Sequence, residues 1–234
     1  MARKPQRSAR AKPKAALPPP GGTERERIIA ALMALLAEKQ IEEIGFGDIA
    51  RRADVSLATL RGEFASALSI LAAHAKELDR KVLAGGESDM AEEPARERLF
   101  DVLMRRIEAM APYREATRSL MRSASCNPGL ALALNVLAVR SQTWMLDAAG
   151  IDAAGPRGAI RAQGTAALFA GVLRVWVDDD DAGLARTLAA LDRALARGQR
   201  WSDMLNGLCR FVPVRCGSRV RRRRDEAEEE AAAA

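Results

Sequence analysis

The sequence predicts an all-α protein with a small N-terminal domain and a larger C-terminal one. Ala, Leu, Arg and Glu dominate the 234 residues, and all four occur readily in helices. Aromatic residues make up only 4% of the chain, and residues that favour strands are sparse. Apolar residues recur three and four positions apart in segment after segment, as on the buried face of a helix. The chain is long enough for one small and one larger domain.

The net charge of +6 lies at the two ends of the chain. Residues 1–14 hold six cations and no acid, residues 215–234 have a net charge of +1, and residues 15–214 have a net charge of −1. A basic surface over the whole body is therefore excluded. Residues 1–22 are rich in Lys, Arg, Pro and Gly, so we expect a disordered basic arm there and a disordered tail at residues 214–234.

The cellular location is inferred from three sequence features. No apolar run reaches the roughly 18 residues of a membrane-spanning helix. The basic N-terminus lacks the apolar segment of a secretory signal. The cysteines Cys126, Cys209 and Cys216 are odd in number and have no metal-binding spacing. These features predict a cytoplasmic protein.

The first three helices are clearly signalled, and the second and third are short. Thr23 and Glu26 have the spacing of a capping box at the start of the first helix. A second helix is predicted at "FGDIARRA", residues 46–53. The turn "DVS" follows, and Ser56 caps a third short helix. Two short helices joined by a tight turn are the helix-turn-helix plan.

Longer helices are predicted for the rest of the chain. Pro94, Pro112 and Pro128 mark helix boundaries. The helical segments cover residues 65–86, 93–112, 129–150, 157–177 and 182–198, and a last amphipathic stripe runs from Trp201 to Val212.

Residues 25–71 resemble the DNA-binding domain of TetR-type transcriptional regulators. "DIARRADVS" is similar to the family's D-I-A-x-x-A-G-V-S, "TLRGEF" stands where the family has T-L-Y-x-H-F, and "SALSILAA" stands where it has S-K-x-x-L. The resemblance implies a TetR-like fold, with a helix-turn-helix domain over residues 23–68 and a ligand-binding and dimerisation domain over residues 69–213. Two chains in a homodimer would read a near-palindromic operator in double-stranded DNA.

The resemblance also implies which residues contact DNA. They are Gly45, Arg51, Ser56, Leu57, Thr59 and Arg61. Arg61, Glu63 and Ala67 replace the family's phosphate-touching Tyr, His and Lys, so Arg61 can restore one contact while the other two are lost. The charged residues of the domain sum to −2, and phosphate neutralisation supplies most non-specific affinity. The basic arm, lying in a minor groove, would offset that deficit.

A second resemblance, near the C-terminus, implies a different function. Residues 168–198 are similar to the end of ubiquinone-biosynthesis accessory proteins, a lipid-binding family with a TetR-like fold that is not thought to act on DNA. The matching residues are Asp178, Thr187, Leu191, Asp192 and Arg193. The stripe from Trp201 to Val212 either packs on the body or makes a peripheral membrane contact helped by the arginines that follow. A lipid-binding accessory protein is therefore the alternative to a regulator.

We expect the C-terminal domain to take a small apolar or lipid-like ligand. The TetR resemblance implies this, since members of that family are most often repressors that lose operator affinity when a ligand fills this domain. Large, soft side chains suit an adaptable apolar pocket, and packing in the core is the alternative role for them. The residues predicted to line the pocket are Met104, Ile107, Trp144, Met145 and Phe169.

We expect two chains to pair through the last long helices. Small residues let helix backbones approach closely, and leucines at helical spacing supply apolar area. The predicted interface residues are Ala167, Gly171, Leu188 and Leu191. The alternative is that the protein's own core uses both helices.

No motif in the sequence predicts an enzyme, a cofactor or a metal site. His74 is the single histidine and has no partner at metal-binding spacing. Residues 178–181 are four aspartates without the Gly and Glu of a calcium loop, and we expect a solvated turn before a helix. Ser56 and Ser66 are expected to be helix caps, since no base is placed to activate them.

Overall fold

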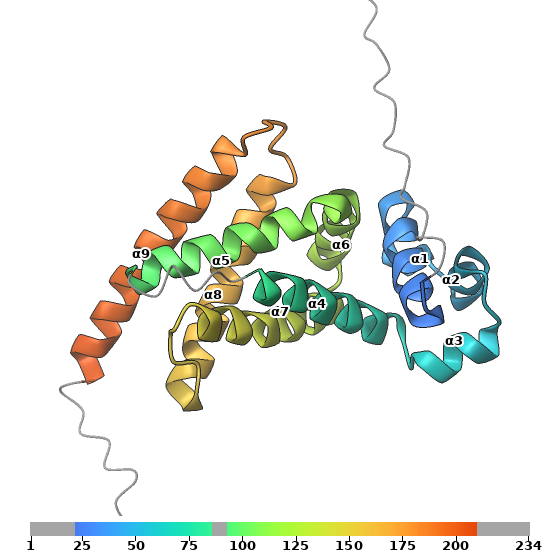
Figure 1. Ribbon diagram of the computed structural model, residues 1–234, viewed down its shortest axis with the longest axis horizontal. Coiled ribbons are helices and arrows are strands. Elements are labelled where there is room, and N and C mark those ends of the chain that lie inside the picture. The colour runs from blue at the N-terminus through green and yellow to red at the C-terminus, as the bar shows by residue number, and fades with distance from the viewer. Residues whose placement is uncertain (1–21, 86–92, 210–234) are drawn as a thin grey trace, which may run out of the picture. The chain divides into compact units, whose positions relative to one another are not determined.

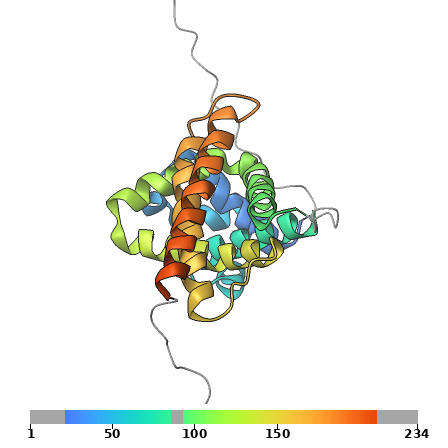
Figure 2. The ribbon, with the colours of Figure 1, turned by 90° about the vertical axis from the view of Figure 1, so that its left-hand side faces the viewer.

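The computed structural model describes residues 22–85 and 93–209, with side chains as far as residue 199. These ranges contain helices and no strand, so the predicted all-α class is confirmed (Figures 1 and 2). Within the described residues, the chain up to Leu195 forms one compact unit, and the end of the last helix, from Ala196 to Cys209, forms a second. In chain order the elements are α1 (Glu24–Glu38), η1 (Ile41–Glu43), α2 (Phe46–Ala53), α3 (Leu57–Glu63), α4 (Ala67–Ala84), α5 (Ala95–Met110), η3 (Ala111–Tyr113), α6 (Arg114–Cys126), α7 (Pro128–Ala148), α8 (Gly155–Trp176) and α9 (Ala185–Cys209).

Capping interactions fix where the first helices begin and end. The Glu26 amide donates to Thr23 Oγ1 at 3.3 Å, and the Thr23 amide donates to the Glu26 carboxylate at 2.8 Å. Asp54 ends α2 in the left-handed conformation, with φ 53° and ψ 52°. The Thr59 amide donates to Ser56 Oγ at 2.9 Å at the start of α3. The predicted capping box and the Ser56 cap are both confirmed.

A first apolar core holds the N-terminal helices together. Ile28 and Leu32 of α1 are fully buried, as is Ile49 of α2, and Leu60 of α3 packs in the same cluster. Each such side chain contributes about 1.5–3 kcal/mol when it leaves water. The apolar spacing seen in the sequence therefore corresponds to the buried faces of these helices.

The first core continues into the C-terminal part of the chain. Ala116 of α6 is buried in it, and Leu134 and Leu137 of α7 pack against it. α4 joins this core to a second one, because Ile70 near its start lies in the first core and Val82 near its end lies in the second. The boundary predicted after residue 68 falls in the first turn of α4, so helices beyond that boundary support the helix-turn-helix directly.

The second core lies among α5, α7, α8 and α9. Leu103, Trp176 and Leu191 are fully buried in it. α7 and α8 pack against each other, and their Asn135 and Gln163 side chains exchange two hydrogen bonds of 3.0 Å each. No helix in the described ranges is both long enough and apolar enough to span a membrane.

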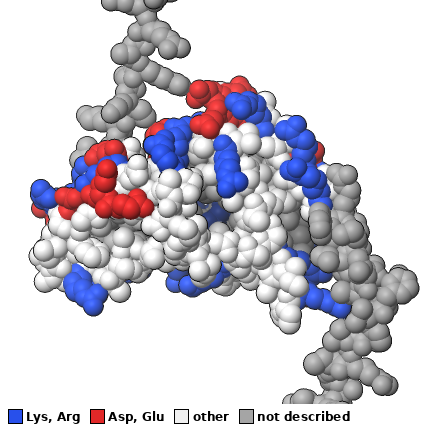
Figure 3. All heavy atoms as spheres, turned by 180° about the vertical axis from the view of Figure 1, so that it is seen from behind, with Lys and Arg blue, Asp and Glu red and all other residues white. Residues whose placement is uncertain are grey.

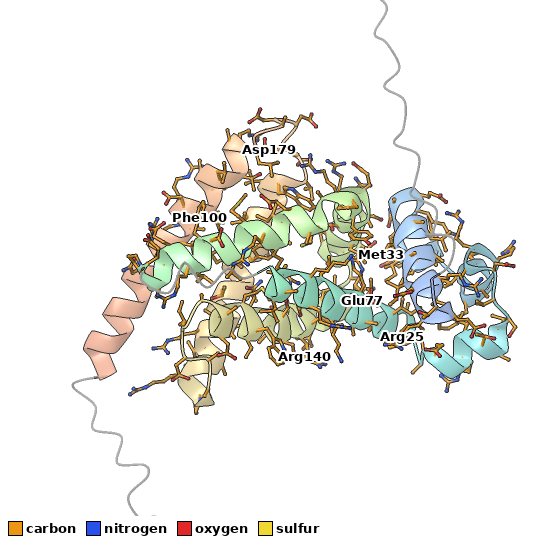
Figure 4. All side chains as sticks on the ribbon, viewed as in Figure 1. Arg25, Met33, Glu77, Phe100, Arg140 and Asp179 are labelled. Carbon is orange, nitrogen blue, oxygen red and sulfur yellow. The ribbon has the colours of Figure 1, made fainter. Side chains whose placement is uncertain are left out.

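The four-aspartate turn between α8 and α9 is only partly solvated. Asp179 is fully buried, and its carboxylate accepts hydrogen bonds from the Thr187 amide at 2.8 Å and the Thr187 hydroxyl at 2.7 Å. These bonds hold the pKa of Asp179 below its ordinary value. Figure 4 labels Asp179 at this turn. The expected solvated turn is right for the exposed Asp178, Asp180 and Asp181 and wrong for Asp179, because that carboxylate caps α9.

Candidate nucleic-acid interface

The outer face of α3 is the surface that a helix-turn-helix presents to a DNA groove. Leu60 and Phe64 anchor the helix from inside and are 2% and 5% exposed. The opposite face presents Leu57, which is 57% exposed, together with Arg61. Phe46, the first residue of α2, is 51% exposed. Insertion into a major groove requires a short helix whose outer side is free, and no described residue covers the outer side of α3.

The structure places the six predicted DNA-contact residues on α2, α3 and their caps. They comprise the exposed N-caps Gly45 and Ser56, the exposed side chains of Arg51, Leu57 and Arg61, and the half-buried Thr59. The Ser56 and Thr59 hydroxyls hydrogen-bond to each other at 3.0 Å, and Arg61 Nη1 donates to the Ala65 carbonyl at 3.2 Å. The residues thus share one region of the fold, while contact with DNA stays a prediction.

Carboxylates compensate several cations near this surface. Lys39 Nζ and Arg51 Nη2 both lie against the Asp48 carboxylate, at 2.8 and 2.7 Å. Arg52 forms a two-pronged pair with Glu38 at 2.7 and 2.9 Å. These hydrogen bonds lower the pKa of Asp48 and of Glu38. Both carboxylates therefore stay ionised at neutral pH and offset part of the positive charge available to phosphate.

The other charged side chains near α3 are also partly paired. Arg25 lies 3.4 Å from the Glu63 carboxylate and over the Phe64 ring, 4.6 Å from its centroid. Arg61 bonds to a main-chain carbonyl and so keeps a charge that no carboxylate of the described residues neutralises. On the face shown in Figure 3, acidic and basic side chains lie together along the upper part, separate basic groups lie along the lower edge, and a broad uncharged area lies between them. The described residues therefore offer DNA isolated cations and no continuous basic field on this face.

A polar hollow of about 240 Å³ lies where α1 ends against α6. Its lining includes Lys39, Glu43, Ser119 and Arg122. Ser119 Oγ donates to the Lys39 carbonyl at 3.1 Å, which ties the end of α1 to α6. No sequence pattern signals this joint, because Lys39 and Ser119 are far apart along the chain and neither belongs to a motif.

The predicted ligand-lining residues divide into two groups. Ile107 and Met145 are fully buried, Phe169 is 4% exposed, and all three lie in the second core, with Met104 partly buried against them. Trp144 is 58% exposed. The placement of Trp144 inside the domain is therefore wrong, because successive residues of α7 point in different directions and Met145 takes the inward position.

Charged side chains that the sequence did not single out lie close to these residues. Asp79 of α4 and Arg106 of α5 form an ion pair inside the protein, and Ser141 of α7 donates to the same carboxylate. One signal in the sequence could have revealed this buried pair. It is a charged residue that stands where the apolar spacing of an amphipathic helix requires an apolar residue. Arg106, between the buried Leu103 and Ile107, shows that signal most clearly.

The predicted dimer residues also divide. Ala167 and Gly171 lie on the exposed side of α8, and a side chain at Gly171 would meet open space. Leu188 is partly buried. Leu191 is fully buried in the second core, so its assignment to an interface is wrong. Leu191 instead packs in the protein's own core, which was the alternative to an interface.

The residues behind the second resemblance have structural roles in the described region. Thr187 bonds to the buried Asp179, and Asp192 pairs with Arg96 of α5. The side chains of the stripe from Trp201 to Val212 lie outside the described residues, as do the basic arm up to residue 21 and the tail from residue 210.

Comparison with known proteins identifies the fold. No protein-family model matches the chain, and no curated protein matches it. The crystal structure of the TetR transcriptional regulator from Nitrosomonas europaea ATCC 19718 is similar, with a TM-score of 0.60 and 21% identity over 76% of this chain and 99% of that one. A TetR transcriptional regulator from Rhodococcus sp. RHA1 has a TM-score of 0.54 and 22% identity, over 75% of this chain and 95% of that one.

The chain has the TetR-like fold. The match spans nearly the whole length of both regulators, so it includes the helix-turn-helix and the helices that follow. At these identities the likeness establishes the architecture, and function has to be argued from the site.

Proposed function

We propose that this protein is a cytoplasmic, TetR-like, DNA-binding transcriptional regulator. The observation that carries the proposal is the free outer face of α3, with Leu57 and Arg61 exposed and Leu60 and Phe64 anchoring the helix from inside. Arg61 supplies a phosphate contact in place of the family's Tyr, and a guanidinium is well suited to that contact. The six cations of residues 1–14 add the charge that the helix-turn-helix lacks.

A salt titration tests the regulator. Fluorescence anisotropy compares the full-length protein on the DNA upstream of its own gene and on a random duplex of equal length. We expect tighter binding to the upstream DNA. Arg61→Ala should weaken binding to both duplexes and reduce the slope of log affinity against log salt by about 0.9, the value of one phosphate contact.

The matched control is Arg122→Ala. Arg122 is an exposed cation on α6, away from α3, so its loss should leave the salt slope unchanged. Wild-type protein that binds both duplexes equally contradicts the proposed function.

We propose further that the regulator is a repressor that releases its operator when an apolar ligand enters the second core. Ile107, Met145 and Phe169 provide the apolar surroundings. α4 provides the coupling, because it is packed in both cores. A ligand can change DNA affinity only if it binds the two states of the protein unequally. A helix shared by both cores gives that difference a route to α3.

We propose that the protein acts as a homodimer through the exposed side of α8. Gly164, Ala167 and Gly171 form a flat stripe there, and Ile160 beside them is 62% exposed. A flat stripe next to a protruding side chain can pack against its own copy across a two-fold axis. Stable interfaces bury about 800 Å² on each partner, so neighbouring residues of α7 or α9 have to contribute as well.

Light scattering tests the dimer. Wild-type protein at micromolar concentration should have twice the mass of one chain, and Ala167→Glu with Gly171→Glu should give monomers, because like charges would face each other in the interface. Ala84→Glu, at the exposed end of α4, is the control and should stay dimeric. A wild-type mass of one chain refutes the dimer.

A lipid-binding accessory protein without a DNA role is the second candidate. The observation that favours it is the charge of the helix-turn-helix, which sums to −2 and has cations paired with carboxylates. In this case the C-terminal stripe would make a peripheral membrane contact. Mass spectrometry of solvent extracts of the purified protein distinguishes the two candidates. Co-purified lipid without specific DNA binding supports the accessory protein, and a lipid-free preparation that binds its upstream DNA excludes it.

A further inference from the structure

The exposed surface at the start of α3 carries apolar side chains. Leu57, the first residue of the helix, is 57% exposed, and the neighbouring Ala58 is exposed as well. Gly62 adds no side chain, and a side chain there would meet no described residue. Nothing described therefore stands between Leu57 or Ala58 and a groove that receives α3.

The polar side chains near this surface already have partners inside the protein. The Ser56 and Thr59 hydroxyls hydrogen-bond to each other at 3.0 Å. Arg61 donates to a main-chain carbonyl, and the Glu63 carboxylate lies 3.4 Å from Arg25. The helix "LATLRGE" has no Asn, Gln or Lys, which with Arg are the side chains that make two-pronged hydrogen bonds to purines. Hydrogen bonding from α3 to base edges is therefore limited.

The major groove of DNA offers one apolar group that identifies a base. Thymine presents its 5-methyl group there, whereas the other three bases present only hydrogen-bond donors and acceptors. An apolar side chain placed against those polar edges removes them from water without replacing their hydrogen bonds, which is unfavourable. Against a methyl group the same side chain gains free energy by burying apolar surface. An apolar residue at the reading position therefore favours thymine.

Leu57 holds the reading position. In a helix-turn-helix the N-terminal residues of the recognition helix contact the base edges, and Leu57 is the first residue of α3. Arg61 follows one turn later. The two side chains are thus suited to different tasks, Arg61 to a phosphate and Leu57 to a base.

We infer that Leu57 selects thymine in the operator by contact with the thymine 5-methyl group in the major groove. The inference rests on the proposed function and names the base that its site recognises. Burial of a methyl group releases no counterions, whereas each phosphate contact does. Leu57 therefore contributes affinity that does not depend on salt, in a domain whose charges sum to −2.

Replacement of thymine by uracil tests the inference, since it removes only the methyl group. Fluorescence anisotropy compares the full-length protein on two versions of the DNA upstream of its own gene, one made with thymidine and one with deoxyuridine. The uracil duplex should bind about fourfold more weakly for each methyl group contacted, which corresponds to about 0.8 kcal/mol per buried methyl group.

Leu57→Ala provides the second readout. Leu57 lies outside the first core, so the variant should keep its fold, which circular dichroism checks. It should bind the thymine duplex more weakly than the wild type does and bind the two duplexes nearly equally. Its salt slope should stay at the wild-type value, because no phosphate contact is lost.

Leu132→Ala is the matched control. Leu132 is a leucine of similar exposure, 67%, and lies on α7. This variant should keep the full preference for thymine. If Leu57→Ala does not fold, the comparison of the two duplexes on wild-type protein decides.

Two results overturn the inference. One is equal binding of both duplexes by the wild type. The other is a thymine preference that persists in Leu57→Ala, which means that DNA shape or another residue is responsible. A random duplex in the same titration judges the proposed function separately. Specific binding without dependence on the methyl group removes the inference alone, whereas the absence of specific binding removes both.

Discussion

The two cores of this protein treat charge in opposite ways. Around the first core the ion pairs lie at the surface, as with Arg52 and Glu38, and the core itself is built from apolar side chains. The Asp79–Arg106 pair is buried against the second core, and Gln142 Oε1 is a buried atom with no hydrogen-bond partner among the described residues. A core of apolar side chains alone specifies one packing and suits a rigid scaffold for α3. An interior with polar groups left to satisfy suits a region that accepts another molecule.

α4 is where the two regions meet, and it shares features of both. Ile70 belongs to the first core and Asp79 to the buried pair with Arg106. Between them His74 is buried, with its ring edge-on to Tyr113 at a centroid distance of 4.4 Å. Substitutions in the second core, on α4 and at α3 should therefore have effects of decreasing size.

The largest effect is expected for Arg106→Met. Removing Arg106 leaves the Asp79 carboxylate buried without its counter-charge, and breaking a buried pair in this way costs about 3–5 kcal/mol of unfolding free energy. Urea denaturation followed by tryptophan fluorescence measures the loss. The double variant Asp79→Leu with Arg106→Met should recover most of the stability, since no lone charge remains. If Arg106→Met alone lowers the unfolding free energy by less than about 1 kcal/mol, the pair behaves like a surface ion pair. That result would contradict the placement of a buried charge pair at the second core.

An intermediate effect is expected from the titration of His74. Burial, with smaller contributions from Lys81 and Arg106, lowers the pKa of His74 from 6.5 to about 4. The unfolded chain takes up a proton at His74 near pH 6.5 and the folded chain does not. The free energy of unfolding is therefore unaffected by His74 above pH 6.5 and falls as the pH is lowered from 6.5 toward 4. The loss should be about 2 kcal/mol at pH 5.

The single histidine makes that prediction easy to measure. The imidazole resonances of His74 in NMR spectra should stay in the neutral form until the pH approaches 4. His74→Gln should remove the decline in stability between pH 6.5 and 5. A titration midpoint near 6.5 in the folded protein shows that the ring is accessible to solvent and that α4 is looser than its packing indicates.

The smallest effect is expected for Ser56→Ala at the start of α3. The variant loses the hydrogen bond from the Thr59 amide to Ser56 Oγ, and loss of such a cap costs about 1 kcal/mol. Thermal denaturation measures this loss. Ser125→Ala is the control, because Ser125 is exposed at the end of α6 and bonds only near its own helix. Equal losses in the two variants would mean that the cap contributes nothing specific.

Much of the first region could be predicted from the sequence because its signals are local. A capping box, a serine cap and the turn at Asp54 each involve residues within a few positions, so the pattern of letters already contains the interaction. Ile28 and Leu32 stand four positions apart, as on one face of a helix, and both are fully buried, as is Ile49. The placement of Gly45, Ser56, Leu57 and Arg61 on α2, α3 and their caps follows from the same local pattern.

The sequence by itself determined the all-α class, the helix-turn-helix and the location of net charge, because helix propensity, spacing and charge are properties of the chain. Only the tertiary structure decided that Trp144 faces outward, that Leu191 is core and that Asp179 is buried. It also decided that Asp79, Arg106 and Ser141 meet. These outcomes depend on which helices become neighbours. Periodicity shows that a helix has a face to bury, but only packing decides which partner covers that face and whether a polar group on it finds a bond.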